Sequence, residues 1–448
     1  MQKEEAKGIL ERTIAAAGGL ELEVMLGGGS DTLTRFANNE ITQNVAERRY
    51  LVSVRIVEGK RTGRATGNDL SKAGIARLIE RAAAATRLSP EIQGLLPLPD
   101  PQTYREVDGF DAATASLGAD ARAGEIGKAV ARCREAGLEG AGIYEVRAGT
   151  IGDYGEIGPL ALANSRGLSA YHVGTSAEFL ISALEGTASG WAGYESHRAG
   201  GVDGAALSAR AVEKAVRSRD PKAWAPGRYT VVLEPAAVAD LIQDMSWISF
   251  GALLVQEGRS FLAGKIGQKV MGENITLRDD PFHPLHRGSP FDSEGMPTIP
   301  TTIIERGVAR SAVYDRQTAA KEGRESTGHG LPVPNTYGPL ARHLVLEGGE
   351  GSVEHLIRRV DRGLLVTRVW YTNVVDPKSV TLTGMTRDGL FAIEKGRVTH
   401  AVRNFRFNQS VVQMLNQVEG MSAPVCSGGV VCPGLLVRDF HMSSATEF

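Results

Sequence analysis

Residues 32–66 read TLTRFANNEITQNVAERRYLVSVRIVEGKRTGRAT, and this stretch decides the fold of the first part of the chain. Its strand-forming residues are interrupted at Asn38-Asn39 and at Glu58-Gly59-Lys60. Asn and Gly accept the positive φ of tight hairpin turns, so the stretch predicts an antiparallel meander. Apolar residues recur at helical spacing from Glu4 to Ala17 and over residues 71–87, which predicts a helix on each side of the meander.

The same order of helix, strands and helix recurs further along the chain. A helical pattern covers residues 123–137, strand patterns cover residues 159–186, and a second helical pattern covers residues 204–220. The turn sequences repeat as well, since FANN compares with LANS and IVEGKRTG compares with ALEGTASG. This repetition predicts an internal duplication. The alternative is two ordinary α+β segments that share turn chemistry.

We therefore predict an α+β fold in which two duplicated N-terminal helix–antiparallel-meander–helix units precede a β-rich C-terminal domain. The first unit covers residues 1–95 and the second covers residues 96–222. A proline-rich linker, residues 88–104, separates the two, because proline cannot continue a helix or a central strand. A new strand opens near Pro226, and we assign residues 223–448 to the C-terminal domain.

The composition is that of a globular protein and disfavours several classes of function. The hydrophobic share of 42% and the charged share of 23% are typical of a chain with a large core. A net charge of -2 disfavours nucleic-acid binding, because that binding needs clustered Lys and Arg. No apolar run approaches the roughly 20 residues of a membrane span, and the N-terminus lacks the features of an export signal. Three cysteines argue against a disulfide framework, so we expect a cytoplasmic protein.

The sequence contains one weak candidate for a metal site. The helical motifs HExxH and HExxxH are absent, and the nearest substitute is RDDPFHPLHRG at residues 278–288. There, His283 and His286 follow two carboxylates and could bind zinc together with Cys426 from the C-terminal part of the chain. A proline-rich surface turn is the simpler interpretation, because a zinc site needs three or four converging ligands.

Other catalytic and binding motifs are missing. The chain has neither the GxSxG of a nucleophile elbow nor the GxxxxGK[ST] of a phosphate-binding loop. Cys432 ends an apolar run and is predicted to lie in the core, whereas Cys426 is expected to be the more exposed thiol. The remaining histidines considered are scattered singly and are interpreted as structural; they are His172, His197, His343 and His355.

Several stretches in the right order resemble one family, TldD/PmbA, whose members are also labelled modulators of DNA gyrase. The resemblance spans nearly the whole chain. It rests on RFANNEITQN with LVSVRIVEGKRTGRATGNDLS, PGRYTVVLEPAAVADL, FDSEGMPTIPTTIIERGVARSAVYD, STGHG, and TLTGMTRDGLFAIEKGRVTHAVRNFRFNQSVVQML. It implies a cytoplasmic assembly of two subunit types that cleaves unfolded peptides. TldD is the catalytic zinc peptidase, and PmbA or TldE is its companion.

The resemblance also locates the segment where the catalytic type carries its metal motif. That type has HExxxH on a helix shortly before a glycine-rich segment, which here resembles GRSFLAGKIGQKVMGENITLRDD. The six corresponding positions are occupied by Gln243, Asp244, Met245, Ser246, Trp247 and Ile248. Gln243 and Ile248 stand where the imidazoles are needed, and no histidine lies between His197 and His283. We therefore expect a helix at this point, with one face filled by the amide of Gln243 and the apolar groups of Trp247 and Ile248. We expect no catalytic, cofactor-binding or metal-binding residue in this chain.

The resemblance thus predicts a PmbA/TldE-like subunit that is catalytically silent. Its expected partners are a TldD-like zinc peptidase, which alone carries the zinc, and an unfolded peptide. A homodimer is expected for the chain in isolation, since closed two-fold dimers are the commonest oligomers. The alternative is an independent metallopeptidase or hydrolase that uses an unrecognised site, with His283, His286 and the C-terminal cysteines as ligands. Direct binding of DNA or gyrase follows from the family label alone and conflicts with the charge.

Overall fold

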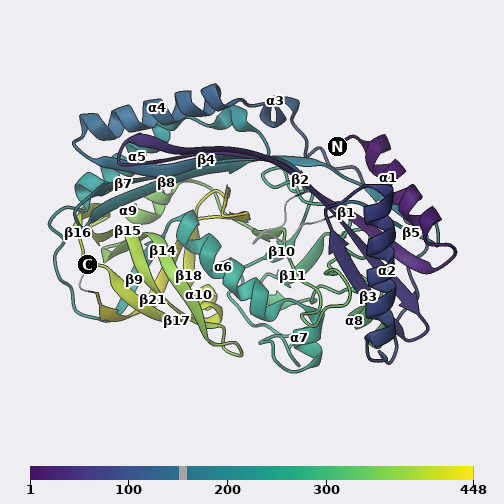
Figure 1. Cartoon of the computed structure of the whole chain (residues 1–448). Coiled ribbons are helices and arrows are strands. Elements are labelled where there is room, and N and C mark those ends of the chain that lie inside the picture. Colours follow the sequence, from purple (N-terminus) through teal and green to yellow (C-terminus); the bar gives the residue numbers. More distant parts are fainter. Residues whose placement is uncertain (151–158, 447–448) are drawn as a thin grey trace.

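The computed structural model describes residues 1–150 and 159–446 of the chain. One long antiparallel sheet organises the N-terminal part and runs across the upper half of Figure 1. Its strands in spatial order are β3 (Arg61–Gly67), β2 (Glu40–Glu58), β1 (Glu21–Ala37), β4 (Glu139–Thr150), β7 (Gly174–Glu185) and β8 (Ala188–Ser196). Two shorter strands, β5 (Pro159–Asn164) and β6 (Ser169–Tyr171), extend it beside β1.

The strand order is symmetric about the central β1–β4 pair: β1, β2 and β3 follow one another on one side, and β4, β7 and β8 on the other. Two copies of one unit would give this order. Strand β1 pairs with β4 from Gly28 to Phe36 and with β5 from Glu23 to Gly27, so β4 and β5 together run along its length. The predicted hairpin turns are confirmed at Asn38-Asn39, where φ is 51° and 63°, and at Gly59. The matching turn between β7 and β8 has Gly186 with φ of 56°.

Helices cover this sheet in two separate groups. The helices α1 (Lys3–Ala16) and α2 (Lys72–Leu88) pack on the first unit, and α3 (Ala112–Ala115), α4 (Ala119–Glu135) and α5 (Gly204–Arg217) pack on the second. A short 3-10 turn, η2 (Ala199–Gly201), precedes α5. Side-chain caps start α2, α3 and α5, since Ser71 accepts from the Gly74 N–H, Asp111 from the Thr114 N–H and Asp203 from the Ala206 N–H. Helices α2 and α5 begin within one residue of the predicted ranges, whereas α4 begins at Ala119, four residues before its predicted range.

The contact between α5 and β8 is close enough that Gly190 has no room for a side chain. A Cβ at Gly190 would lie 2.1 Å from the Ala211 carbonyl oxygen and 2.5 Å from the Ala215 nitrogen, both in the backbone of α5. We expect Gly190→Ala to lower the free energy of unfolding by about 2 to 3 kcal/mol, because overpacking against backbone cannot be relieved by a rotamer change. Urea denaturation measures this change.

The matched control is Gly124→Ala in α4, where an added Cβ meets nothing within 4 Å. Alanine is the better residue inside a helix, so this variant should gain about 0.5 to 1 kcal/mol. Equal stability of the two variants would contradict the close packing of α5 on β8.

The C-terminal part contains a ring of five strands that pair around to the first one. Strand β14 pairs with β9 and with β15, β15 with β17, β17 with β21, and β21 with β9. Its interior is part of the largest apolar cluster, which includes Leu233, Val366 and Phe407. The ring strands are β9 (Gly227–Leu233), β14 (Arg362–Asp376), β15 (Thr381–Glu394), β17 (Phe405–Ser410) and β21 (Leu435–Ala445). Beside them lie β16 (Arg397–Ala401), β18 (Val418–Met421), α9 (Val353–Arg358) and α10 (Val411–Asn416).

A small third sheet lies next to this ring and positions the candidate site. In spatial order it contains β12 (Val308–Ala309), β11 (Thr301–Glu305), β10 (Leu277–Asp279), β13 (Leu344–Leu346), β20 (Val430–Cys432) and β19 (Val425–Ser427). The helices of this region are α6 (Pro235–Ser249), α7 (Ala252–Gln256) and α8 (Arg316–Lys321). Helix α6 packs its apolar side into the same large core as the ring.

The α+β class with antiparallel sheets is confirmed, and the boundaries at residues 95 and 222 stay predictions. The linker 88–104 bridges the two halves of the molecule: Pro99 O accepts from Asn164 Nδ2, and Pro97 O accepts from Arg316 Nη2. Cys432 is fully buried, as predicted. None of the helices within the described ranges is long and apolar enough to cross a membrane.

Candidate functional site

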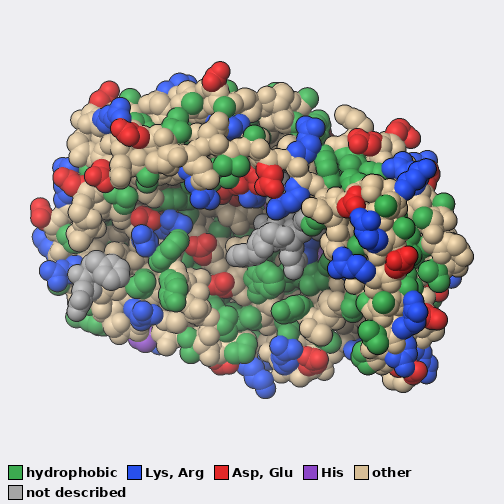
Figure 2. All heavy atoms as spheres, in the orientation of Figure 1, with side chains coloured by type: hydrophobic (Ala, Val, Ile, Leu, Met, Phe, Trp, Pro, Cys, Tyr) green, Lys and Arg blue, Asp and Glu red, His purple; other side chains and the backbone are tan. Residues whose placement is uncertain are grey.

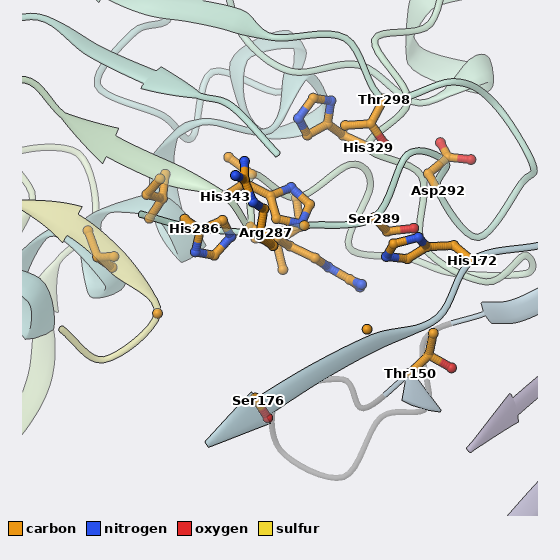
Figure 3. Close-up of a pocket in the computed structure, with 18 of the residues that line it drawn as sticks. Thr150, His172, Ser176, His286, Arg287, Ser289, Asp292, Thr298, His329 and His343 are labelled. Carbon is orange, nitrogen blue, oxygen red and sulfur yellow. The ribbon is translucent and has the colours of Figure 1, made fainter. Parts of the chain in front are cut away.

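A cavity of about 300 Å³ lies between the N-terminal sheet and the C-terminal part of the molecule. Figure 2 shows this face hollowed between its upper and lower halves, with both acidic and basic side chains visible in the hollow. Its walls come from the ends of β4 and β7, from β8, from α6, and from the loops at residues 286–298, 328–330 and 340–344. Segments far apart in the sequence therefore meet here, as Figure 3 shows for ten of the lining residues.

Helix α6 presents one side to the cavity and the other to the core. Gln243, Ser246 and Trp247 line the cavity, as residues three and four apart on a helix do. Ser246 Oγ donates to the Ala341 carbonyl oxygen at 2.9 Å, which ties the helix to the opposite loop. Ile248 instead packs against the apolar core. The helix is present where expected, but the prediction that Ile248 shares the face of Gln243 and Trp247 is wrong, because a step of five residues turns a regular helix by about 140°.

These positions do not fit a zinc ion. An amide is a poor zinc ligand, and an indole provides none of the usual nitrogen, sulfur or carboxylate donors. Asp244, the acidic neighbour of Gln243, is half-buried, and burial raises the pKa of its carboxyl group. Over the described ranges, no group of three or more His, Cys, Asp or Glu side chains is arranged to hold a metal ion.

Beneath the cavity lies a fully buried carboxylate, Asp279, at the end of β10. Its Oδ2 accepts from the backbone N–H groups of Arg342 and His343, both at 2.7 Å. Its Oδ1 lies 3.0 Å from His329 Nε2 and 3.4 Å from His343 Nδ1, although neither contact has the angle of a good hydrogen bond. Burial alone raises the pKa of Asp279, but attraction to the two imidazoles outweighs burial and holds that pKa well below its ordinary value. Asp279 is therefore an anion that faces both imidazoles.

Two further imidazoles extend this group along the cavity wall (Figure 3). The ring of His286 packs edge-on against that of His343, with 5.3 Å between their centroids. Burial, followed by repulsion from His343, lowers the pKa of His286 to about 3 and that of His172 to about 4. Both are neutral near pH 7, so each carries one N–H donor and one nitrogen acceptor.

Two buried carboxyl groups, Asp292 and Glu294, stand at the other end of the cavity. Asp292 lines it and accepts from the backbone N–H groups of Glu294, Met296 and Gly330 at 2.7–2.9 Å. Both carboxyls crowd Gly330, since a Cβ there would lie 2.6 Å from Glu294 Oε2 and 2.9 Å from Asp292 Oδ2. Burial raises the pKa of Asp292 to about 6, and burial together with the charge of Asp292 raises that of Glu294 to about 8. Glu294 is therefore mostly protonated at neutral pH.

Of the three residues in the predicted metal site, only one lines the cavity. His286 lines the cavity, whereas His283 and Cys426 are not among its lining residues. His283 lies on the same loop and accepts from the Leu285 N–H through Nδ1 at 3.2 Å. Cys426 in β19 is half-buried, and burial and then the charge of Glu195 raise the pKa of its thiol, which opposes the thiolate that zinc requires.

The interpretation of His172 and His343 as scattered structural residues is incomplete, because the fold gathers them at one cavity. His329 and Asp279 complete the group. His329 was not predicted as a site residue, and Asp279 was considered only as one of the two carboxylates of the weak metal candidate. The available signal was the position of His329 in STGHG and of Asp279 in the RDD that ends the glycine-rich segment. Both stretches carry the family resemblance although neither forms a known catalytic pattern.

Two family models match this sequence. The model for the PmbA/TldA metallopeptidase C-terminal domain matches residues 226–444, and that for PmbA/TldA metallopeptidase domain 1 matches residues 22–86. The chain belongs to the PmbA/TldD family. Members of this family are metallopeptidase-like proteins, and the matched ranges contain α6, β10, Asp279, Arg287, His329 and His343.

Relatives and solved structures agree with this assignment. The chain is 27% identical to a metalloprotease of Methanothermobacter thermautotrophicus over 48% of each chain. It is 26% identical to a metalloprotease PmbA homologue of Haemophilus influenzae, over 46% of this chain and 44% of that protein. The chain thus spans about half the length of these relatives. In overall fold it is similar to TldE from Thermococcus kodakarensis, with a TM-score of 0.84, 24% identity, and coverage of 97% of this chain and 99% of that one. A Thermotoga maritima protein described as a candidate modulator of a DNA gyrase has the same TM-score at 22% identity and the same coverage.

Proposed function

We propose that this PmbA/TldD-family chain is a companion subunit that pairs with a TldD-like zinc peptidase in the cytoplasm and helps hold an unfolded peptide. In this role the chain binds no zinc and does not cleave peptide bonds by itself. The observation that carries the proposal is on α6, where the two positions that the metal motif would fill with imidazoles hold Gln243, which lines the cavity, and Ile248, which packs against the core. The similarity in fold to a TldE protein supports the same role.

The decisive experiment compares the chain alone with the chain plus a TldD-like partner. Metal content is measured by mass spectrometry, and hydrolysis of an unfolded peptide is followed with and without a chelator. We expect no stoichiometric zinc in the lone chain, and cleavage that appears or accelerates only when both proteins are mixed. Stoichiometric zinc with chelator-sensitive cleavage by the lone chain would refute the companion role.

The oligomeric state forms part of the same proposal. In isolation the chain should form a homodimer, and the partner should replace one copy to give a heterodimer. Light scattering after size-exclusion chromatography distinguishes a dimer from a monomer of 47.7 kDa, and the presence of both chains in one peak identifies the heterodimer. A strictly monomeric chain that also fails to bind the partner would contradict the assembly.

The geometry of α6 gives a further test of its lost metal site. In the double variant Gln243→His with Trp247→His, both imidazoles face the cavity from adjacent helical turns. In Gln243→His with Ile248→His, the second imidazole points into the core. We expect zinc to bind the first variant at least roughly tenfold more tightly than the second, because in this α6 residue 247 lines the cavity together with residue 243, whereas residue 248 packs against the core. Titration with zinc against a competing dye measures both affinities, and equal affinities would show that α6 is not a regular helix here.

An independent hydrolase is the second candidate, and one observation favours it. His343 stands between the buried carboxylate of Asp279 and the cavity, the arrangement in which a carboxylate orients a general base. This function predicts cleavage by the lone chain that resists chelator and is lost in His343→Ala. The peptide assay above therefore separates the two candidates in one set of measurements.

A further inference from the structure

Arg287 places a positively charged guanidinium in the wall of the cavity (Figure 3). Only part of its hydrogen-bonding capacity is satisfied by neighbouring residues. Its Nη1 donates to the backbone carbonyl oxygens of Phe282 at 3.2 Å and of His283 at 3.3 Å. Within the described ranges, Nε and Nη2 donate to no acceptor, and no carboxylate lies within ion-pair distance of the guanidinium. A guanidinium with two unused nitrogens is unusual at a half-buried position.

Other charged side chains that line the cavity form ion pairs or hydrogen bonds with residues of the protein itself. Arg147 forms ion pairs with Glu145 at 2.9 Å and with Asp31 at 3.6 Å. Glu195 accepts from the Gly429 N–H at 2.8 Å, and Asp292 accepts from three backbone N–H groups. Both carboxylates accept from backbone donors, and within the described ranges neither lies within ion-pair distance of Arg287.

Two uncharged imidazoles, those of His172 and His286, line the same cavity as Arg287. His172 and Arg287 both approach Gly109, where a Cβ would lie 3.5 Å from Arg287 Cβ and 3.6 Å from His172 Cε1. His286 is the chain neighbour of Arg287, and its Nε2 is buried without a hydrogen-bond partner. The cavity volume of about 300 Å³ is at the small end of ligand-binding pockets, which suits the end of a peptide or one side chain.

We propose that this cavity receives a carboxylate group of a bound peptide, with the Arg287 guanidinium as its principal partner. The proposal rests on the proposed function, because it names the part of an unfolded peptide that this chain holds. A planar guanidinium matches the two oxygens of a carboxylate through parallel hydrogen bonds. A polyanion such as nucleic acid would require several unpaired cations and would meet Asp292 and Glu195 in the same wall. The carboxylate comes either from the C-terminus of the peptide or from an Asp or Glu side chain.

Three versions of one short unstructured peptide distinguish these sources. The first has a free C-terminus and no acidic residue, the second is the same peptide amidated, and the third is amidated and carries one Glu. Fluorescence anisotropy with the full chain gives their affinities. We expect a carboxylate-bearing peptide to bind at least about tenfold more tightly than the peptide without one. Preference for the first identifies the chain end and preference for the third identifies the side chain, whereas equal affinities, or no binding of any peptide up to millimolar concentration, overturns the proposal.

Variants assign the preference to Arg287. Arg287→Gln should remove it, and Arg287→Lys should retain part of it, because lysine keeps the charge but loses the two-point contact. The matched control is Arg306→Gln, which removes an exposed cation paired with Glu273 outside the cavity and should leave the preference intact. Retention of the full preference in Arg287→Gln would overturn the assignment, and the wild-type comparison stands even if that variant unfolds.

The binding measurement needs no partner protein, so it fails independently of the companion role. A chain that prefers the carboxylate but never activates a TldD-like peptidase would refute the companion role alone. A chain that activates the peptidase without any carboxylate preference would refute the Arg287 site alone.

Discussion

Asp279→Asn is expected to lower the free energy of unfolding by about 1 to 3 kcal/mol, the usual cost of leaving buried hydrogen-bonding groups without their partner. The substitution keeps the shape of the side chain and one oxygen for the N–H groups of Arg342 and His343. It removes the negative charge that faces His329 and His343, and it can place an amide N–H₂ against their ring nitrogens. Chemical denaturation followed by circular dichroism measures the loss.

Asp280→Asn is the matched control, because the adjacent carboxylate accepts only from the Phe282 N–H and lies 3.8 Å from Arg278 Nε. Asparagine can keep that acceptor, so we expect a loss below about 1 kcal/mol. Comparable losses at both positions would show that the buried anion has no special role.

The effect of Asp279→Asn also depends on pH in a definite direction. The pKa of Asp279 lies well below its ordinary value of 3.8 in the folded state. Its contribution to stability is therefore complete above that ordinary value and is lost as the pH falls through the lowered folded pKa. The difference in free energy of unfolding between wild type and Asp279→Asn should become smaller in acid. A difference that becomes larger there would contradict the negative charge assigned to Asp279.

The hairpins of the N-terminal sheet could be predicted because their turns are local. Asn38-Asn39 and Glu58-Gly59-Lys60 determine their turns through their own backbone preferences, and the strands beside them pair directly. The ring of five strands could not be predicted in the same way. It needs β9 to pair in parallel with β14, more than a hundred residues later, and no local feature of either strand specifies that neighbour.

For the candidate site, too, local features could be predicted from the sequence, and contacts between distant segments could not. The sequence located α6 and the positions at which the family's metal motif would fall, because a family motif is a local pattern. It did not predict that His172 and His343 meet, because each comes from a different segment and the carboxylate between His329 and His343 lies on a third. The wrong face assigned to Ile248 is different, since helical geometry alone could have corrected it.

Glu294→Gln is expected to raise the free energy of unfolding at high pH, whereas replacing a buried acid usually lowers it. At low pH we expect little change. The folded protein keeps a proton on Glu294 up to about pH 8, whereas an ordinary glutamate releases it near 4.5. Between these values the folded state binds more protons, so the free energy of unfolding of the wild type falls as the pH rises.

Glutamine resembles the protonated acid and can still accept from the Arg316 N–H, as Glu294 Oε2 does at 3.0 Å. We therefore expect the variant to be close to wild type at pH 5 and more stable by about 2 to 4 kcal/mol at pH 9, because each pKa unit corresponds to about 1.4 kcal/mol. Thermal and urea unfolding at both pH values measure the difference. The exposed Glu325→Gln should follow the wild type within about 0.5 kcal/mol throughout.

The direction of this change identifies which force acts on the Asp292–Glu294 pair. If burial and mutual repulsion dominate, the stability gain of Glu294→Gln grows with pH, because the wild type must ionise a second carboxyl beside Asp292 at Gly330. If nearby cations such as Arg316 dominate instead, the carboxylate is favoured in the folded state, and the variant loses stability at high pH. Asp292 lines the same cavity as Arg287, so the charge state of the pair bears on the environment that a peptide carboxylate would enter.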